Sequence, residues 1–232
     1  MSQRLWVRIG ALSGVVYVVL LIAGFAIGVA SAPTPPSIFG TPEQVANQTA
    51  AVTPMGVWIG LYLEVVALLC FVVFAAFVRT LTQSVEHEAQ WLDDAAFGAA
   101  LIFASLQLLS MAILGLVSYR AGTGANVATA TALLDLRLGG YILSWSVGAL
   151  WLGLVAATAL RTGMLGRGLG VSGLLIALVW LASCIIPTSD VAQFWGFVPL
   201  VWTTAASINM LRRSTYRREI TNSGVLSSGT LS

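Results

Sequence analysis

Six stretches of predominantly apolar residues follow one another along the chain, separated by short polar breaks. Five of them contain no charged residue and the sixth contains only Glu64; they cover residues 9–42, 55–78, 95–119, 138–160, 168–189 and 191–211. A membrane-spanning helix needs roughly 20 predominantly apolar residues, so each stretch is long enough to cross a bilayer. The pattern predicts an all-α polytopic membrane protein, built as a six-transmembrane-helix bundle.

We expect a single transmembrane domain over residues 1–212, because the loops leave no room for a separate soluble domain. The six spans are predicted near residues 8–30, 55–78, 95–118, 132–160, 168–187 and 191–211. Residues 213–232 form a tail that turns into Ser, Gly and Thr, and we expect this tail to be cytoplasmic and disordered. The first span is too long for the roughly 7–15-residue core of a signal peptide, so we expect it to be retained.

Local signals add detail to these spans. Thr41-Pro42-Glu43-Gln44 has the pattern of a helix start, which predicts a short interfacial helix over residues 42–51. Asp93 and Asp94 directly precede the third predicted span and should cap its N-terminus. Pro199 falls inside the sixth predicted span, where we expect a kink.

Small residues recur at four-residue spacing, which would let neighbouring helices approach closely. The pairs are Gly10/Gly14, Gly24/Gly28, Gly56/Gly60, Ser144/Gly148 and Gly166/Gly170. Tryptophans near the predicted span ends indicate interfacial belts rather than an aromatic ligand cage, since they come from both sides of the bilayer. They are Trp6, Trp58, Trp91, Trp195 and Trp202.

The arginines predict the orientation. With six spans and both termini in the cytoplasm, Arg120 and Arg137 would be the only basic residues outside, which satisfies the positive-inside rule. We therefore expect a multi-pass protein of the cell inner (plasma) membrane with both termini cytoplasmic. A last group of arginines should contact the headgroups of anionic lipids. It consists of Arg212, Arg213, Arg217 and Arg218.

Composition excludes several chemistries. Apolar residues make up 58% of the chain and charged residues 9%, against roughly 25% charged residues in soluble domains. There is no lysine for a Schiff base, and the single histidine, His87, lies in a polar loop. Two-histidine haem ligation, a Ser-His pair and a histidine metal centre inside the membrane are therefore excluded. We expect no enzyme, no cofactor, no metal site and no nucleic-acid partner.

One residue, Glu64, should carry a high free-energy cost of burial in the membrane. Glu64 is the only carboxylate well inside a predicted span, roughly 10 Å below its outer end if that span begins near residue 57. A charged side chain at such a depth is expensive, so it should face the bundle interior and have a partner. Gln107 reaches a similar depth on the third span, counted from the inner side.

The partner of Glu64 is expected on the fourth span. The apolar run 128–134 can extend that span outward, which would bring Arg137 about two turns deep, near the level of Glu64. Tyr141 follows one turn later on the same helix face. We therefore predict an outer-half polar cluster of Glu64, Gln107 and Arg137, joined by Tyr141 or Asp135.

This cluster has two interpretations. It is either a ligand or proton site that opens outward, or a buried ion pair that fixes the helix register, and we favour the ion pair. Our leading hypothesis for function is accordingly a non-enzymatic membrane bundle or accessory subunit with a membrane-protein partner. The alternative is a small transporter or permease-like protein with an outward-facing polar site around Glu64.

Two strings carry a family resemblance: RIGALSGVVY at residues 8–17 and RLGGY at residues 137–141. Together with the arginine-ended last span, they resemble small bacterial six-helix integral membrane proteins that are grouped as a domain of unknown function. The resemblance extends over nearly the whole chain. It implies six helices and supplies no catalytic residues.

Overall fold

The computed structural model describes the backbone of residues 3–31, 54–83, 90–121, 127–185 and 196–227. Side chains are described over 5–31, 55–83, 90–120, 128–185 and 196–212. This part of the chain forms six helices and no strand, which confirms the all-α prediction there. The helices are α1 (Gln3–Ala30), α3 (Pro54–Gln83), α4 (Gln90–Ala121), α5 (Val127–Thr162), α6 (Arg167–Ser183) and α8 (Val198–Ser227).

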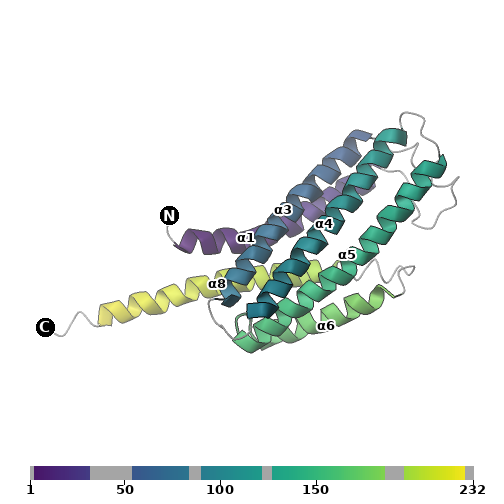
Figure 1. Cartoon of the computed structure of the whole chain (residues 1–232). Helices are drawn as coiled ribbons and strands as arrows, with labels where there is room; N and C mark the ends of the chain where they lie inside the picture. Colours follow the sequence, from purple (N-terminus) through teal and green to yellow (C-terminus); the bar gives the residue numbers. More distant parts are fainter. Residues whose placement is uncertain (1–2, 32–53, 84–89, 122–126, 186–195, 228–232) are drawn as a thin grey trace.

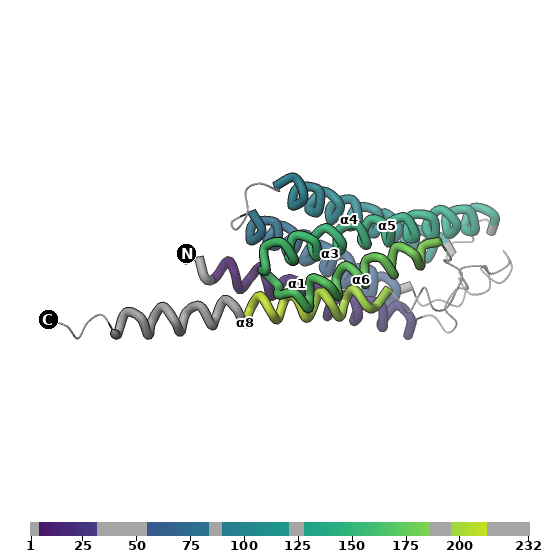
Figure 2. Tube along the Cα trace, turned by 90° about the horizontal axis from the view of Figure 1, so that it is seen from below, coloured from purple at the N-terminus to yellow at the C-terminus, as the bar shows by residue number. Residues whose placement is uncertain are grey.

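The six helices close into a ring. Each packs on the next in the order α1, α3, α4, α5, α6 and α8, and α8 packs back on α1 (Figures 1 and 2). Both chain ends lie at the same end of the bundle (Figure 1). We call the opposite end, where α1, α4 and α6 finish and α3, α5 and α8 begin, the distal end.

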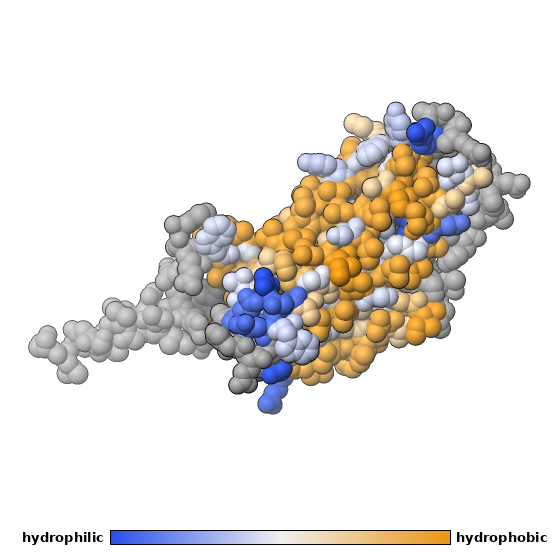
Figure 3. Space-filling model, viewed as in Figure 1, coloured by the Kyte–Doolittle hydropathy of each residue, from blue (hydrophilic) through white to orange (hydrophobic). Residues whose placement is uncertain are grey.

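Four helices are long and apolar enough to cross a membrane: α1, α3, α4 and α5. The fifth, α6, is apolar but has only 17 residues, about 25 Å of helix. Apolar side chains cover the middle of the face in Figure 3, and hydrophilic ones gather mostly toward its two ends. These apolar helices indicate a membrane protein, and six complete spans with cytoplasmic termini remain a prediction.

The last two helices differ from the predicted spans. The fifth helix ends at Ser183 instead of near 187, and Cys184 and Ile185 form a turn. The sixth begins at Val198 instead of 191, so Pro199 is its second residue. The kink predicted at Pro199 is therefore wrong, because proline is tolerated in the first turn of a helix, where no backbone partner is lost.

The tail also contains helix, since α8 continues to Ser227, past residue 213, where a disordered tail was expected to begin. Several further predictions lie outside the described residues. They concern the short helix over 42–51, the His87 loop, Trp195 and the side chains of Arg213, Arg217 and Arg218. The Arg212 side chain, which is described, is exposed.

The α1 and α3 helices approach each other closely at two glycines. A Cβ atom added at Gly24 would lie 2.7 Å from the carbonyl oxygen of Gly60, and one added at Gly60 would lie 2.7 Å from the carbonyl oxygen of Gly24. The predicted role of small residues is confirmed here and at Gly148, where a Cβ would lie 2.7 Å from Cη2 of Trp180.

The tryptophan belt is only partly as expected. Trp6, Trp58 and Trp91 are exposed near helix ends, as interfacial residues should be. Trp202 is buried instead, and its indole Nε1 donates a hydrogen bond to the Leu169 carbonyl oxygen at 2.9 Å. Trp202 therefore ties α8 to α6, and the interfacial prediction is wrong for it.

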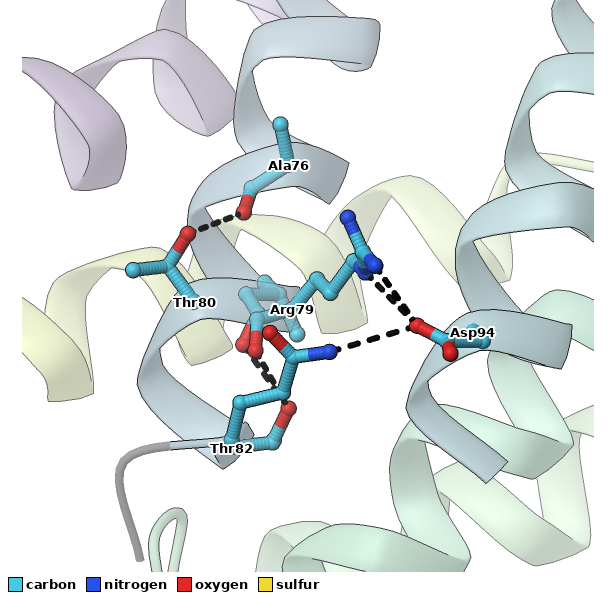
Figure 4. Close-up of polar contacts among 7 residues, drawn as sticks. Ala76, Arg79, Thr80, Thr82 and Asp94 are labelled. Atoms are coloured by element: carbon cyan, nitrogen blue, oxygen red, sulfur yellow. Dashed lines mark hydrogen bonds and ion pairs between the residues drawn. The ribbon is translucent and has the colours of Figure 1, made fainter. Parts of the chain in front are cut away.

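The two aspartates near the start of α4 do not cap it from outside. The helix begins at Gln90, so Asp93 lies within its first turn, where it still favours the helix dipole. Asp94 instead forms a salt bridge with Arg79 of α3, with 2.8 Å between Nη2 and Oδ1, and also accepts a hydrogen bond from Gln83 at 3.2 Å (Figure 4). The pair joins α3 to α4 at the termini end.

We expect this salt bridge to contribute little to stability. The side chains of Arg79 and Asp94 are 41% and 55% exposed, so water and salt screen their attraction. The Asp94→Asn variant should lose about 0.2–1 kcal/mol in the free energy of unfolding, measured by thermal unfolding of the purified protein. At ~1 M salt the difference from the parent protein should vanish. A larger, salt-independent loss would contradict this weak role.

Candidate functional site

A cavity of about 130 Å³ lies inside the ring of helices. All six helices, together with the turn before α8, contribute to its wall, so it is a property of the whole bundle. A single water needs only ~10–15 Å³ measured in this way, so the space holds several waters or one small organic molecule. Its wall contains Glu64, Gln107 and Tyr141, three of the four residues that the sequence predicted to form a polar cluster.

The depth of these residues follows from the helix bounds. Glu64 lies ten residues into α3 and Arg137 ten residues into α5, so both are about 15 Å from the distal end. Gln107 and Tyr141 each lie fourteen residues from the distal end of their own helix, about 21 Å away. The predicted extension of the fourth span is confirmed, since α5 begins at Val127. The cluster therefore lies in the distal half of the bundle.

Arg137 is close to Glu64 but does not line the cavity. The two charges interact electrostatically, yet they form no salt bridge among the described residues. The Nε atom of Arg137 is buried and has no hydrogen-bond partner there, while the Arg137 carbonyl oxygen accepts a long hydrogen bond from Ser110 at 3.5 Å. The direct ion pair expected from the sequence is therefore not formed, and the carboxylate belongs to the wall of a cavity. Asp135 is exposed and does not line it.

Aromatic rings make up much of the remaining wall. Phe71 of α3 is at their centre, with ring centroids 5.1 Å from Tyr17, 5.3 Å from Phe103 and 4.8 Å from Trp151. The contacts with Phe103 and Trp151 are edge-to-face, at interplanar angles of 69° and 73°. In an edge-to-face contact, the edge of one ring lies against one face of the other. The other aromatic residues of the wall are Phe25, Tyr141, Trp145, Trp180 and Phe197.

Two polar groups of the wall differ in how they are satisfied. The Thr203 hydroxyl donates to the Pro199 carbonyl oxygen at 2.8 Å, one turn earlier on α8. The indole Nε1 of Trp180 is buried without a hydrogen-bond partner among the described residues. Buried polar groups are normally paired, so an unpaired donor beside a cavity indicates room for water or a ligand.

The cavity extends toward the distal end, where two of the residues that line it are partly exposed. Phe25 of α1 and Phe197, just before α8, both line it and are 50% and 43% exposed. Their ring centroids are 5.7 Å apart in an edge-to-face contact. These two rings line the side of the cavity between α1 and the start of α8.

Sequence reasoning missed the aromatic wall. It considered tryptophans near span ends, whereas Trp145 and Trp151 lie well inside α5, Trp180 lies about one turn before the end of α6, and all three line the cavity. A usable signal was present, because interfacial tryptophans occupy span ends, and mid-span tryptophans need another explanation. Aromatic residues do line the cavity, but apart from Trp145, Trp151 and Trp180 they are not tryptophans, and none of the tryptophans near the predicted span ends is among them.

The polar side chains of the wall are few. Among the described residues, the wall offers one carboxylate, one amide, two phenols, one hydroxyl and three indole N–H groups, and no histidine or cysteine. No group of three or more potential ligands for a metal ion occurs among the described residues. A comparison with family models, with curated proteins and with solved structures finds no significant match in any of the three.

Proposed function

We propose that this protein is a small permease-like membrane protein whose central cavity binds a small solute at Glu64. The observation that carries the proposal is that the cavity wall contains Glu64, which forms no salt bridge with Arg137 among the described residues. An intramembrane carboxylate beside a cavity is typical of substrate and proton pathways, because its cost is maintained only where it serves binding.

A purely structural role for Glu64 fits this geometry less well. A buried ion pair fixes helix register through direct, well-shaped contact between its charged groups. Here the Glu64 side chain lines a cavity, and Nε of Arg137 has no hydrogen-bond partner among the described residues. An ion pair that fixes helix register would leave neither a cavity beside the carboxylate nor an unpaired guanidinium nitrogen.

An accessory-subunit role has less support than a binding role. Some small residues that could receive a partner helix are used within the bundle, as at Gly24, Gly60 and Gly148, while a Cβ at Gly28 or Gly139 would meet open space. We therefore keep the permease-like role as the proposal, without enzymatic activity. The excess of arginines on the side of the termini supports cytoplasmic termini in a plasma membrane, with the last arginines near anionic headgroups.

Accessibility of the cavity to a small reagent tests the proposal. Thr203 lines the cavity and is 2% exposed, whereas Ser207, one turn deeper on α8, is 0% exposed and does not line it. In a background with Cys70→Ala and Cys184→Ala, methyl methanethiosulfonate should modify the cysteine of Thr203→Cys. It should leave the matched Ser207→Cys variant unmodified, as measured by intact-mass spectrometry of protein in lipid nanodiscs.

The two variants place the same side chain on the same helix at similar burial. A difference in their modification by the reagent therefore depends only on whether the residue lines the cavity. A membrane protein with a sealed core would leave both cysteines unmodified, and that result would contradict the proposed function. Modification of both would mean that the bundle opens generally, which would also contradict a defined site. Size-exclusion profiles matching the parent protein confirm that each variant is folded.

A further inference from the structure

We propose that the solute bound in this cavity is a small organic ammonium ion, held by the Glu64 carboxylate and by aromatic ring faces. This inference rests on the proposed function, because it names the ligand class of the same site. Three features of the wall support it: its charge, its aromatic surface and its small number of other polar groups.

The charge of the wall favours a cation. Among the described residues that line the cavity, Glu64 is the only charged one. Arg137 interacts with Glu64 but stands outside the wall, so a solute in the cavity meets the carboxylate directly and the guanidinium only beyond it. No lysine, arginine or histidine in the wall is placed to receive an anion.

The aromatic rings favour an organic cation over an inorganic one. A Mg²⁺ ion needs about six oxygen ligands that converge on one point. The side-chain oxygens of the described wall belong to Glu64, Gln107, Thr203 and two tyrosines, which lie on five different helices. An alkylammonium ion spreads its charge over methyl groups and is attracted to the faces of Trp, Tyr and Phe. Tyr141 and Trp145, with ring centroids 5.0 Å apart, extend such a surface toward the level of Glu64.

A sugar or another highly polar neutral solute needs many hydrogen-bond partners. The remaining polar side-chain groups of the described wall are one amide, one hydroxyl, two phenols and three indole N–H groups in an otherwise apolar lining. The Thr203 hydroxyl is already engaged with the Pro199 carbonyl oxygen. Gln107, which is buried, supplies one amide. A cavity that is apolar over most of its wall, with one carboxylate, matches a ligand that is apolar over most of its surface, with one positive charge.

Protection of the Thr203→Cys thiol tests the ligand class without a labelled substrate. The full chain in nanodiscs, in sodium phosphate buffer, is treated with methyl methanethiosulfonate in the presence of choline or of its neutral isostere, 3,3-dimethyl-1-butanol. The two molecules have the same shape and differ in one charge. Choline should slow the modification about 10-fold or more at saturation, and the isostere less than about 2-fold.

Variants then assign the charge selectivity to the carboxylate. Glu64→Gln keeps the shape of the side chain and removes its charge, so choline should protect no better than the isostere. Asp135→Asn, which neutralises an exposed carboxylate of α5 outside the cavity, should leave choline protection unchanged. Should Glu64→Gln fail to fold, the comparison of the two ligands on Thr203→Cys alone still decides the question.

The outcomes separate the two proposals. Equal protection by both ligands, or no protection by either at a thiol that the reagent reaches, overturns the ammonium ligand and leaves the proposed cavity function standing. A thiol that the reagent never reaches overturns both. Choline protection that survives in Glu64→Gln places the cation elsewhere and overturns the assignment to this carboxylate.

Discussion

The Gly24→Ala variant should lose about 1–3 kcal/mol in the free energy of unfolding, because its new methyl group would meet the backbone of α3. A Cβ at this position would lie 2.7 Å from the carbonyl oxygen of Gly60 and 2.7 Å from Cγ of Glu64. Backbone cannot rotate away as a side-chain end can, so α1 must move off α3. For a chain of this size the melting temperature should fall by roughly 2–4 °C per kcal/mol.

The matched control is Gly28→Ala, one turn further along α1. A Cβ at Gly28 would have no atom within 4 Å, so the same substitution on the same helix meets open space. Alanine is a better helix former than glycine by roughly 1 kcal/mol, so this variant should be as stable as the parent or slightly more stable. Equal melting temperatures for Gly24→Ala and the parent protein would show that the α1–α3 contact tolerates a methyl group.

The Gly24→Ala substitution should also affect the cavity, in addition to lowering stability. The methyl group of Gly24→Ala would also displace the Glu64 side chain, which lines the cavity. Under conditions where the variant is still folded, we expect altered modification of Thr203→Cys. Gly28→Ala should retain the parent rate, since it touches neither Gly60 nor Glu64.

The fold was predictable from the sequence where a single physical rule dominates. Length and apolarity determine α1, α3, α4 and α5, and the small-residue spacing indicated the contact at Gly24 and Gly60. Helix bounds were less predictable, because apolarity continues through turns as readily as through helices. This explains why the predicted fifth span passed beyond Ser183 and why Pro199 was placed inside a helix that it helps to start.

The site was predictable in its depth but not in its contacts. Helical rise placed Glu64 and Arg137 at one level, and α5 does begin early enough to bring them there. Whether two charges touch depends on helix rotation and on the volume of neighbouring side chains, which a single sequence does not specify. Rings from four helices surround the cavity at Phe71, and these long-range contacts have no local signature.

The Phe71→Ala variant should lose about 2 kcal/mol in the free energy of unfolding, although the helices are expected to lie in lipid. Lipid tails are as apolar as the helix interior, so little transfer energy is lost when the ring is removed. The remaining loss comes from the cavity that the ring leaves behind. Its volume is about 100 Å³, and each Å³ of cavity costs ~24 cal/mol. Phe71 is 1% exposed and contacts Tyr17, Phe103 and Trp151, so these neighbours cannot fill the space freely.

Leu69→Ala is the matched control for the same helix, since Leu69 lies two residues away and is exposed on the surface of the bundle. Its truncation should change the melting temperature little, because lipid can replace the lost contacts. Phe71→Ala should in addition enlarge the cavity and raise the rate at which methyl methanethiosulfonate modifies Thr203→Cys. Equal stability losses in the two variants would mean that burial in the bundle adds nothing beyond contact with lipid, which would contradict an aromatic wall that holds the site open.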